Sequence, residues 1–166
     1  MTPPPPDLSR FHAAQDQPRA GHADALREMQ AGAKRSHWIW YVLPQLSGLG
    51  LSDMAQTYGL RGGAEAEAYL RDPVLRGRLL GITSAIARHV VPPACTTLAS
   101  LMGSEIDARK AVSSLTLFEH VSQAMPATEH LGDVQALGDV ATRILDAVAS
   151  QGCERCPLTL ASLESD

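Results

Sequence analysis

The chain has 166 residues and a mass of 17.7 kDa, the size of one domain that can bury its own core. Hydrophobic residues make up 45% and charged residues 19%, which excludes an intrinsically disordered chain. A formal net charge of −4 argues against broad binding to a nucleic acid backbone. Aromatic residues account for only 4%. Because sheets depend on aromatic and β-branched side chains, the composition predicts an all-α, compact multihelical single domain.

Nothing in the sequence predicts export or a membrane location. The first ten residues lack the basic and apolar regions of a signal peptide. The longest apolar stretch, Trp38 to Pro44, is far shorter than the roughly 20 residues of a membrane span. The three cysteines, Cys95, Cys153 and Cys156, do not form the pattern of a secreted disulfide framework. We therefore expect a cytoplasmic protein that binds neither membrane nor nucleic acid.

A tail is expected before the folded part of the chain. Residues 1–6 contain four consecutive prolines, which donate no backbone hydrogen bonds, and this predicts a disordered proline-rich tail. A single helical domain is expected over residues 7–166. Asp7 can cap a first short helix, and a second helix is expected from His22 to Gln30, ended by Gly32.

A segment rich in aromatic residues follows between Ser36 and Gln45. Ser36 is a suitable N-cap and Pro44 a suitable stop, so a two-turn helix is predicted here. A short buried strand is the alternative, because periodicity cannot distinguish the two over so few residues. A further helix is expected after its cap at Ser52 and runs to Tyr58.

The remaining helices have clear boundaries in the sequence. Asp72-Pro73 is the strongest helix start, because aspartate accepts amide hydrogen bonds and proline at the first helical position removes no donor that the helix needs. The long helix that follows keeps helical spacing of its apolar residues to Val90. Other helices are predicted at 64–71, 97–102, 105–123, 133–150 and 159–163.

Two segments carry residues whose chemistry suggests a binding site. In the first, basic side chains directly precede aromatic ones: Lys34, Arg35 and His37, then Trp38, Trp40 and Tyr41. Aromatic rings beside cationic donors suit a nucleotide or another anionic ring system. The alternative is that the aromatic side chains are core and that the basic residues begin a solvated helix.

The second segment is the helix expected over 105–123, which carries the second of only two lysines in the chain. At spacings of three and four, Asp107, Lys110 and Ser114 share one face of it, and Ser113 lies further round. Lys110 could hold an anion, Asp107 could act as a base or orient the lysine, and Ser114 could donate a hydrogen bond. The alternative is a boundary helix whose polar side chains bond one another.

Cys153 and Cys156 have CxxC spacing but predict no metal or redox site on their own. A zinc site needs four ligands, and no second pair with suitable spacing occurs. A redox CxxC is expected within a βαβ pattern, which this chain lacks. The glycine-rich phosphate-binding motifs and the GxSxG motif are also absent. We therefore predict no metal and no cofactor, and interpret the two thiols as incidental.

The block from Ser36 to Gln45, the Gly48-Leu49-Gly50 turn and the run from Asp107 to Phe118 occur in an order that resembles a known bacterial family. This is DUF1810, a family of unknown function whose members are sometimes labelled calpastatin. The resemblance covers nearly the whole chain after the proline tail and is most specific in the first of these blocks. It implies a compact, mainly helical single domain and no established activity.

A second similarity, of layout only, is to the NADAR family. It consists of a serine followed by an aromatic-rich helix that ends in glutamine, with a later helix that carries a lysine. That family is linked to cleavage of N-glycosidic bonds in ADP-ribose-type or riboflavin-pathway compounds. This resemblance implies a hydrolase that acts on a nucleotide-like or N-glycosidic substrate.

We therefore predict one pocket, shared by the Ser36–Gln45 block and the helix from Asp107 to Phe118, for a small nucleotide-like or anionic ligand. The expected catalytic residues are His37 and Asp107. The expected ligand-binding residues are Lys34, Ser36, Trp38, Trp40, Gln45, Lys110, Ser113 and Ser114. The alternatives are a ligand-binding domain without turnover and a protein-interaction domain in which the aromatic block is core. The sequence indicates no particular oligomeric state.

Overall fold

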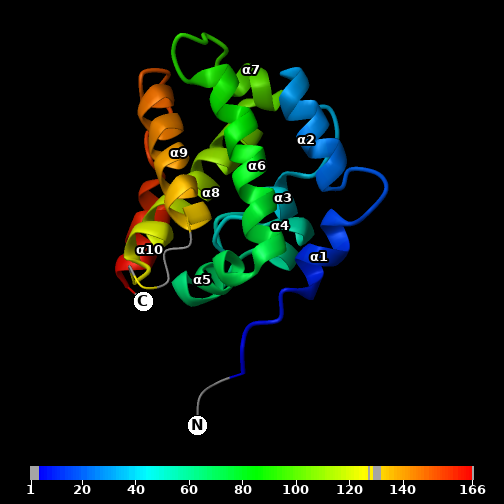
Figure 1. Cartoon of the computed structure of the whole chain (residues 1–166), viewed down its shortest axis with the longest axis vertical. Coiled ribbons are helices and arrows are strands. Elements are labelled where there is room, and N and C mark those ends of the chain that lie inside the picture. The colour runs from blue at the N-terminus through cyan, green and yellow to red at the C-terminus, as the bar shows by residue number, and fades with distance from the viewer. Residues whose placement is uncertain (1–3, 127, 129–131, 166) are drawn as a thin grey trace.

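The computed structural model describes residues 4–126, 128 and 132–165, and in these residues the chain forms ten α-helices (Figure 1). In chain order they are α1 (Ser9–Gln15), α2 (His22–Ala31), α3 (Ile39–Val42), α4 (Asp53–Tyr58), α5 (Gly63–Arg71), α6 (Pro73–Val90), α7 (Leu98–Met102), α8 (Glu105–Ala124), α9 (Gly132–Ala149) and α10 (Pro157–Glu164). The prediction of an all-α fold is confirmed. Within the described residues, β structure is limited to one isolated bridge between Leu46 and Leu60.

The long helix α6 runs through the middle of the molecule, and the other helices are arranged around it (Figure 1). It packs against α2 on one side and α9 on the other. The longest helix, α8, packs against α9, α5, α7 and α10. The single turn α3 contacts α1, α4, α6 and α8, so the aromatic block lies at a junction of four helices. Among the described helices, none combines the length and apolarity needed to cross a membrane.

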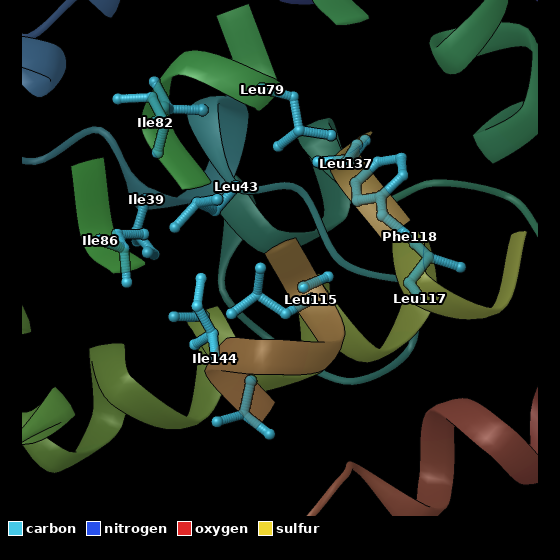
Figure 2. Packing of buried hydrophobic residues seen from close by; sticks show 14 of the residues in the cluster. Ile39, Leu43, Leu79, Ile82, Ile86, Leu115, Leu117, Phe118, Leu137 and Ile144 are labelled. Carbon is cyan, nitrogen blue, oxygen red and sulfur yellow. The ribbon is translucent and has the colours of Figure 1, made fainter. Parts of the chain in front are cut away.

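One cluster of buried apolar side chains forms the core of this arrangement. Figure 2 shows how side chains from α3, α6, α8 and α9 meet in it. Each fully buried leucine or isoleucine stabilises the fold by about 1.5–3 kcal/mol relative to an exposed one, so the cluster is the main source of stability. The labelled members are Ile39, Leu43, Leu79, Ile82, Ile86, Leu115, Leu117, Phe118, Leu137 and Ile144.

The two helices α8 and α9 approach each other closely at Gly138. A Cβ atom built at this glycine would lie 2.5 Å from Oγ of Ser122, closer than two such atoms can approach. The absence of a side chain at Gly138 therefore permits the observed packing of α9 on α8.

The helix starts predicted at Ser52 and Asp72 are confirmed. The predicted cap at Asp7 was wrong, because Leu8 is the N-cap residue of α1 and Asp7 accepts a hydrogen bond from the N–H of Ser9 at 2.9 Å. Oγ of Ser52 accepts a hydrogen bond from the backbone N–H of Ala55 at 3.1 Å. Oδ1 of Asp72 accepts hydrogen bonds from the N–H groups of Val74 and Leu75, both at 3.0 Å. These local interactions satisfy N–H groups that have no partner inside the helix, and so they fix where each helix begins.

The predicted two-turn helix between Ser36 and Gln45 was too long. The structure has a single helical turn there, Ile39–Val42, and the competing prediction of a strand was wrong. Ser36 does not cap this turn; its hydroxyl donates instead to the carboxylate of Glu28 at 2.5 Å. Because the Ser36 hydroxyl is bound to Glu28 and does not cap the helix, the helix begins only at Ile39, with Trp38 as its N-cap residue.

The expected proline tail lies partly outside the described residues. Pro4 to Pro6 are exposed, and the chain leaves the helices at this end (Figure 1). The predicted boundary between a disordered tail and a single domain over 7–166 stays a prediction, as does a cytoplasmic location.

Candidate functional site

Both lysines of the chain meet at one carboxylate, between the segment that precedes α3 and the first turns of α8. Nζ of Lys34 lies 2.8 Å from Oδ2 of Asp107, and Nζ of Lys110 lies 3.6 Å from Oδ1 of the same residue. The lysine–aspartate cluster, defined as these three residues, therefore has two positive charges and one negative charge. An excess positive charge favours an anionic partner.

The ammonium group of Lys34 is buried and contacts partners within the protein. Only 6% of its side chain is exposed. Its Nζ donates to the backbone carbonyl of Ser36 at 2.8 Å and lies 5.1 Å from the centroid of the Trp38 ring system. With Asp107, two acceptors of the protein lie within hydrogen-bond distance of the ammonium group, and the Trp38 ring stabilises its charge. Lys34 thus holds the structure together and is not placed to receive a ligand.

Lys110 has a different environment, although it shares the same carboxylate. Its side chain is 24% exposed, and its distance to Asp107 is too long for a hydrogen bond. The ammonium group lies 4.8 Å from the centroid of the Trp40 ring system, which stabilises the charge but accepts no conventional hydrogen bond. Lys110 therefore keeps donors available for an acceptor from outside.

Trp40 and Lys110 line a small pocket, which we call the Trp40–Lys110 pocket. It leaves about 10 Å³ for the centre of a water molecule, close to the space that one water requires. Nε1 of Trp40 is buried and has no hydrogen-bond partner in the described part of the protein. The other lining residues are Ile39, Leu43, Gln45, Ala55, Tyr58 and Gly59.

Glu28, which the sequence analysis did not select, organises the wall beside this pocket. Its carboxylate accepts hydrogen bonds from the backbone N–H of Arg35 at 2.8 Å and of Ser36 at 3.1 Å. It also accepts from the Ser36 hydroxyl, and from Nε1 of Trp38 at 2.8 Å. One side chain at the end of α2 therefore fixes the path of the segment that carries Lys34.

The hydrogen bonds to Glu28 make the stability of the protein depend on pH. Burial alone would raise the pKa of this carboxyl, but the hydrogen bonds from Arg35, Ser36 and Trp38 outweigh it and lower the pKa to about 2. A carboxyl whose pKa is lowered by folding stabilises the protein above its unfolded pKa of about 4.3, and this contribution is lost as the pH falls towards 2. Allowing for partial exposure, we expect the contribution at neutral pH to be about 2–3 kcal/mol.

Urea unfolding of the wild type and the Glu28→Gln variant, followed by tryptophan fluorescence, measures this contribution. We expect the difference in unfolding free energy between the two proteins to shrink steadily from pH 5 to pH 2. Asp72 and Glu119 also have lowered pKa values, but both are present in each protein and cancel in the difference. A difference that stays constant over this range would show that Glu28 is not the titrating group.

The structure brings together only part of the predicted site. Lys34, Ser36 and Asp107 lie in or against the lysine–aspartate cluster, and Gln45 lines the pocket with Trp40 and Lys110.

The other predicted site residues lie elsewhere. His37 is exposed and does not line the pocket. Trp38 is completely buried, so its ring offers no face to a ligand. This burial agrees with the alternative interpretation, in which Trp38 is a core residue. Ser113 lies on a separate cleft with Cys156. Ser114 is fully buried, and its hydroxyl has no partner in the described residues.

The arrangement of charges suits an anion and not a metal cation. In the part of the chain that the structure describes, no group of three or more histidine, cysteine, aspartate or glutamate side chains is placed to hold a metal ion. At the lysine–aspartate cluster the single carboxylate already neutralises a buried lysine. A ligand with negatively charged oxygens would complement Lys110, whereas a cation would be repelled.

Comparison with known proteins agrees with the fold and assigns no activity. Residues 5–145 match the model of a family described as "Protein of unknown function (DUF1810)". The chain is also similar to the crystal structure of the conserved hypothetical protein Rv1873 from Mycobacterium tuberculosis, with 33% sequence identity and a TM-score of 0.71. That match covers 95% of this chain and 96% of the other. No curated protein matches this chain.

Proposed function

Because the chain belongs to the DUF1810 family, whose description assigns no activity, we propose from the site geometry that it binds a small ligand through a phosphate or carboxylate group at the Trp40–Lys110 pocket. One observation carries this proposal. Nζ of Lys110 lies over the Trp40 ring, and within the described residues neither this group nor Nε1 of Trp40 has a hydrogen-bond acceptor.

A buried donor without a partner, Nε1 of Trp40, and a partly exposed ammonium group, that of Lys110, favour the entry of an acceptor at this pocket. A buried N–H group without a partner costs about 1–3 kcal/mol, and an oxygen from a ligand would recover that energy. The oxygen of a phosphate or carboxylate would also balance the excess positive charge of the lysine–aspartate cluster. These interactions would be stronger than in water, because the surrounding side chains are apolar.

The size and walls of the pocket define how such a ligand would bind. Its interior holds no more than one small group, so the bulk of the ligand would remain outside. Trp38 is buried and Lys110 covers one face of Trp40, which disfavours stacking of a base on either indole. A nucleotide-like ligand would therefore be recognised by its phosphate.

Hydrolysis of an N-glycosidic bond, which the resemblance to the NADAR family implies, has less support from the geometry. Asp107 serves as counter-ion to both lysines, and His37 does not line the pocket. A general acid or base needs to reach the reacting atom directly or through one water. We therefore place binding without turnover first, and catalysis by His37 and Asp107 stays a prediction.

Thermal unfolding in the presence of candidate ligands tests the proposal. The probes are inorganic phosphate, acetate, ribose 5-phosphate, AMP and ADP-ribose, with ribose and adenosine as neutral controls at matched ionic strength. A ligand at ten times its Kd adds about 1.4 kcal/mol to the stability of the folded state. For a domain of this size, this corresponds to a rise in Tm of about 3–6 °C. Failure of every anionic probe to raise Tm would contradict the proposal.

The Lys110→Met variant tests the residue itself, since methionine keeps an apolar stem and removes the charge. The pair with Asp107 is long and partly exposed, so we expect a loss of stability below about 1 kcal/mol. The affinity for the anionic probe should fall at least about tenfold, because the main charge-assisted hydrogen bond is lost.

Arg109→Met is the matched control, because it removes an exposed positive charge from the adjacent position of α8. It should leave the affinity within about twofold of wild type, since an exposed charge outside the pocket is largely screened by salt. Equal losses of affinity in the two variants would show that the protein attracts anions only through its overall field. A loss of 3–5 kcal/mol in Lys110→Met would show that the lysine is a structural ion-pair partner.

A further inference from the structure

A second cleft, separate from the Trp40–Lys110 pocket, contains both members of the CxxC pair. It lies where α8, the end of α9 and the start of α10 meet, and it has about 330 Å³ of space open to water-sized molecules. Cys153, Cys156 and Ser113 all line it. Both cysteines are partly exposed and carry free thiols. Two thiols that sequence spacing alone did not distinguish from incidental ones therefore share one accessible cavity.

The segment that carries the pair is fixed to the rest of the protein. Arg155, between the two cysteines, donates from Nε and Nη2 to the two oxygens of Glu119, both at 2.7 Å, and from Nη2 to Asp146 at 2.9 Å. The backbone N–H of Cys156 donates to the hydroxyl of Thr116 at 3.1 Å. The thiols are thus presented on a rigid support and not on a loose loop.

The groups around Cys156 stabilise the thiolate form of its side chain. It is the N-cap residue of α10, where backbone N–H groups have no partner inside the helix. Burial would raise the pKa of this thiol, but hydrogen bonds from the hydroxyls of Ser113 and Thr159 and from the N–H groups of Thr159 and Leu158 outweigh it, and the pKa falls below its ordinary value.

The buried side chain of Thr159, in the first turn of α10, provides a second observation. It is completely buried, and although its hydroxyl lies beside the sulfur of Cys156, it makes no well-aligned hydrogen bond within the described residues. A thiol sulfur is a weak acceptor and a thiolate is a strong one. The hydroxyl beside Cys156 is therefore satisfied best when the sulfur is charged.

We propose that Cys153 and Cys156 form a dithiol pair that reacts with small hydroperoxides, with Cys156 as the nucleophile and Cys153 as the resolving thiol. The charged residues that line the cleft are Glu105, Glu154 and Arg109, which give it an excess of negative charge. A neutral oxidant such as hydrogen peroxide is therefore favoured over an anionic one such as glutathione disulfide. Burial, with a smaller contribution from the charge of Glu105, raises the pKa of Cys153. The Cys153 thiol therefore stays protonated while the Cys156 thiolate reacts with the peroxide.

The reaction balances as two steps. The Cys156 thiolate attacks one oxygen of the peroxide, the O–O bond breaks, and the leaving hydroxide takes a proton to become water, which leaves a sulfenic acid on Cys156. The sulfur of Cys153 then attacks that sulfur and releases its proton, the S–O bond breaks, and a second water leaves. Two thiols lose two electrons and one peroxide is reduced to two waters. A small thiol reductant restores the pair by exchange.

Peptide mapping by mass spectrometry of the intact protein treated with hydrogen peroxide tests this proposal. We expect a disulfide between Cys153 and Cys156, while the exposed Cys95 remains a thiol and serves as internal reference. In Cys153→Ser, the sulfenic acid should persist on Cys156 and be trapped by dimedone. In Cys156→Ser no disulfide should form, and Cys95→Ser should behave as wild type. Oxidation of Cys95 at the same rate as Cys156 would overturn the proposal.

The Thr159→Val variant separates a stabilised thiolate from simple accessibility. Valine has nearly the shape of threonine, and the lost hydroxyl has no other partner in the described residues, so Tm should change by no more than about 2 °C. The rate at which iodoacetamide alkylates Cys156 at pH 7 should fall at least about threefold, because less thiolate is present. An unchanged rate in a folded variant would refute the role given to Thr159 and, with it, the proposed nucleophile.

Discussion

Replacing Asp107 by asparagine is expected to lower the free energy of unfolding by about 3 kcal/mol, although the exchange removes only one charge. Lys34, whose side chain is 6% exposed, would keep its positive charge without a counter-ion 2.8 Å away. A buried charge that loses its partner is far more costly than a lost surface ion pair. For a chain of this size the expected fall in Tm is about 6–12 °C, measurable by calorimetry.

A double variant shows whether the loss comes from the unpaired lysine. In Lys34→Met combined with Asp107→Asn, no buried charge remains in the lysine–aspartate cluster, and we expect most of the stability to return, to within about 1–2 kcal/mol of wild type. Glu105→Gln is the control, because Glu105 is exposed in the first turn of α8, and its loss should cost less than about 1 kcal/mol. A stable Asp107→Asn variant would mean that Lys34 does not depend on this carboxylate.

Arg155→Met is expected to cost about 3 kcal/mol, the second of the two large effects. It leaves the Glu119 carboxylate, whose side chain is 10% exposed, with the Thr142 hydroxyl at 2.6 Å as its remaining side-chain partner. The segment before α10 also loses the side-chain contacts of Arg155 to α8 and α9, and keeps the hydrogen bond from the Cys156 N–H to Thr116. In the wild type, burial would raise the pKa of Glu119, but the hydrogen bonds that Arg155 and Thr142 donate to it outweigh burial and lower the pKa. Urea unfolding at neutral pH therefore compares the variant with a wild type in which this carboxylate is charged and paired.

The matched control for Arg155 is Arg143→Met, at an exposed position of α9. This change should alter the free energy of unfolding by no more than about 0.5 kcal/mol, as is usual for exposed positions. Adding Glu119→Gln to Arg155→Met should recover part of the loss, because the amide has no charge to leave unpaired. An Arg155→Met protein as stable as wild type would show that the ion pair offsets only its own desolvation.

Helix positions could be predicted from the sequence wherever the determinants are local. The caps at Ser52 and Asp72 act over two or three residues, and the apolar spacing of α6 reports its buried face directly. Family membership followed from the order of the residues between Ser36 and Phe118, and the family match confirms it. The sequence analysis also placed both lysines at one site, because these scarce residues fell in two chemically similar segments, and in the structure both lie against Asp107.

The role of Glu28 could not be predicted, because it depends on the shape of a turn. Gly32 has a φ of 86°, and this left-handed conformation sends the chain back over the end of α2. Glu28 thereby reaches Ser36 and Trp38, eight and ten residues further on. Spacing rules for helices extend only three or four residues, so they gave no reason to connect these positions. The same contacts explain why the predicted helix cap at Ser36 was wrong.

The concentration of both lysines in one cluster limits how this protein can be handled chemically. The chain has 14 lysine and arginine residues, of which only two are lysines. Lys34 is nearly inaccessible, which leaves Lys110 as the principal side-chain amine for acylating dyes, crosslinkers and sensor-chip coupling. A label attached there would sit on the Trp40–Lys110 pocket and occupy the donor that ligands would need. Immobilisation through the lysine side chain would therefore block ligand binding at the Trp40–Lys110 pocket, whereas attachment through a chain terminus would leave the pocket accessible.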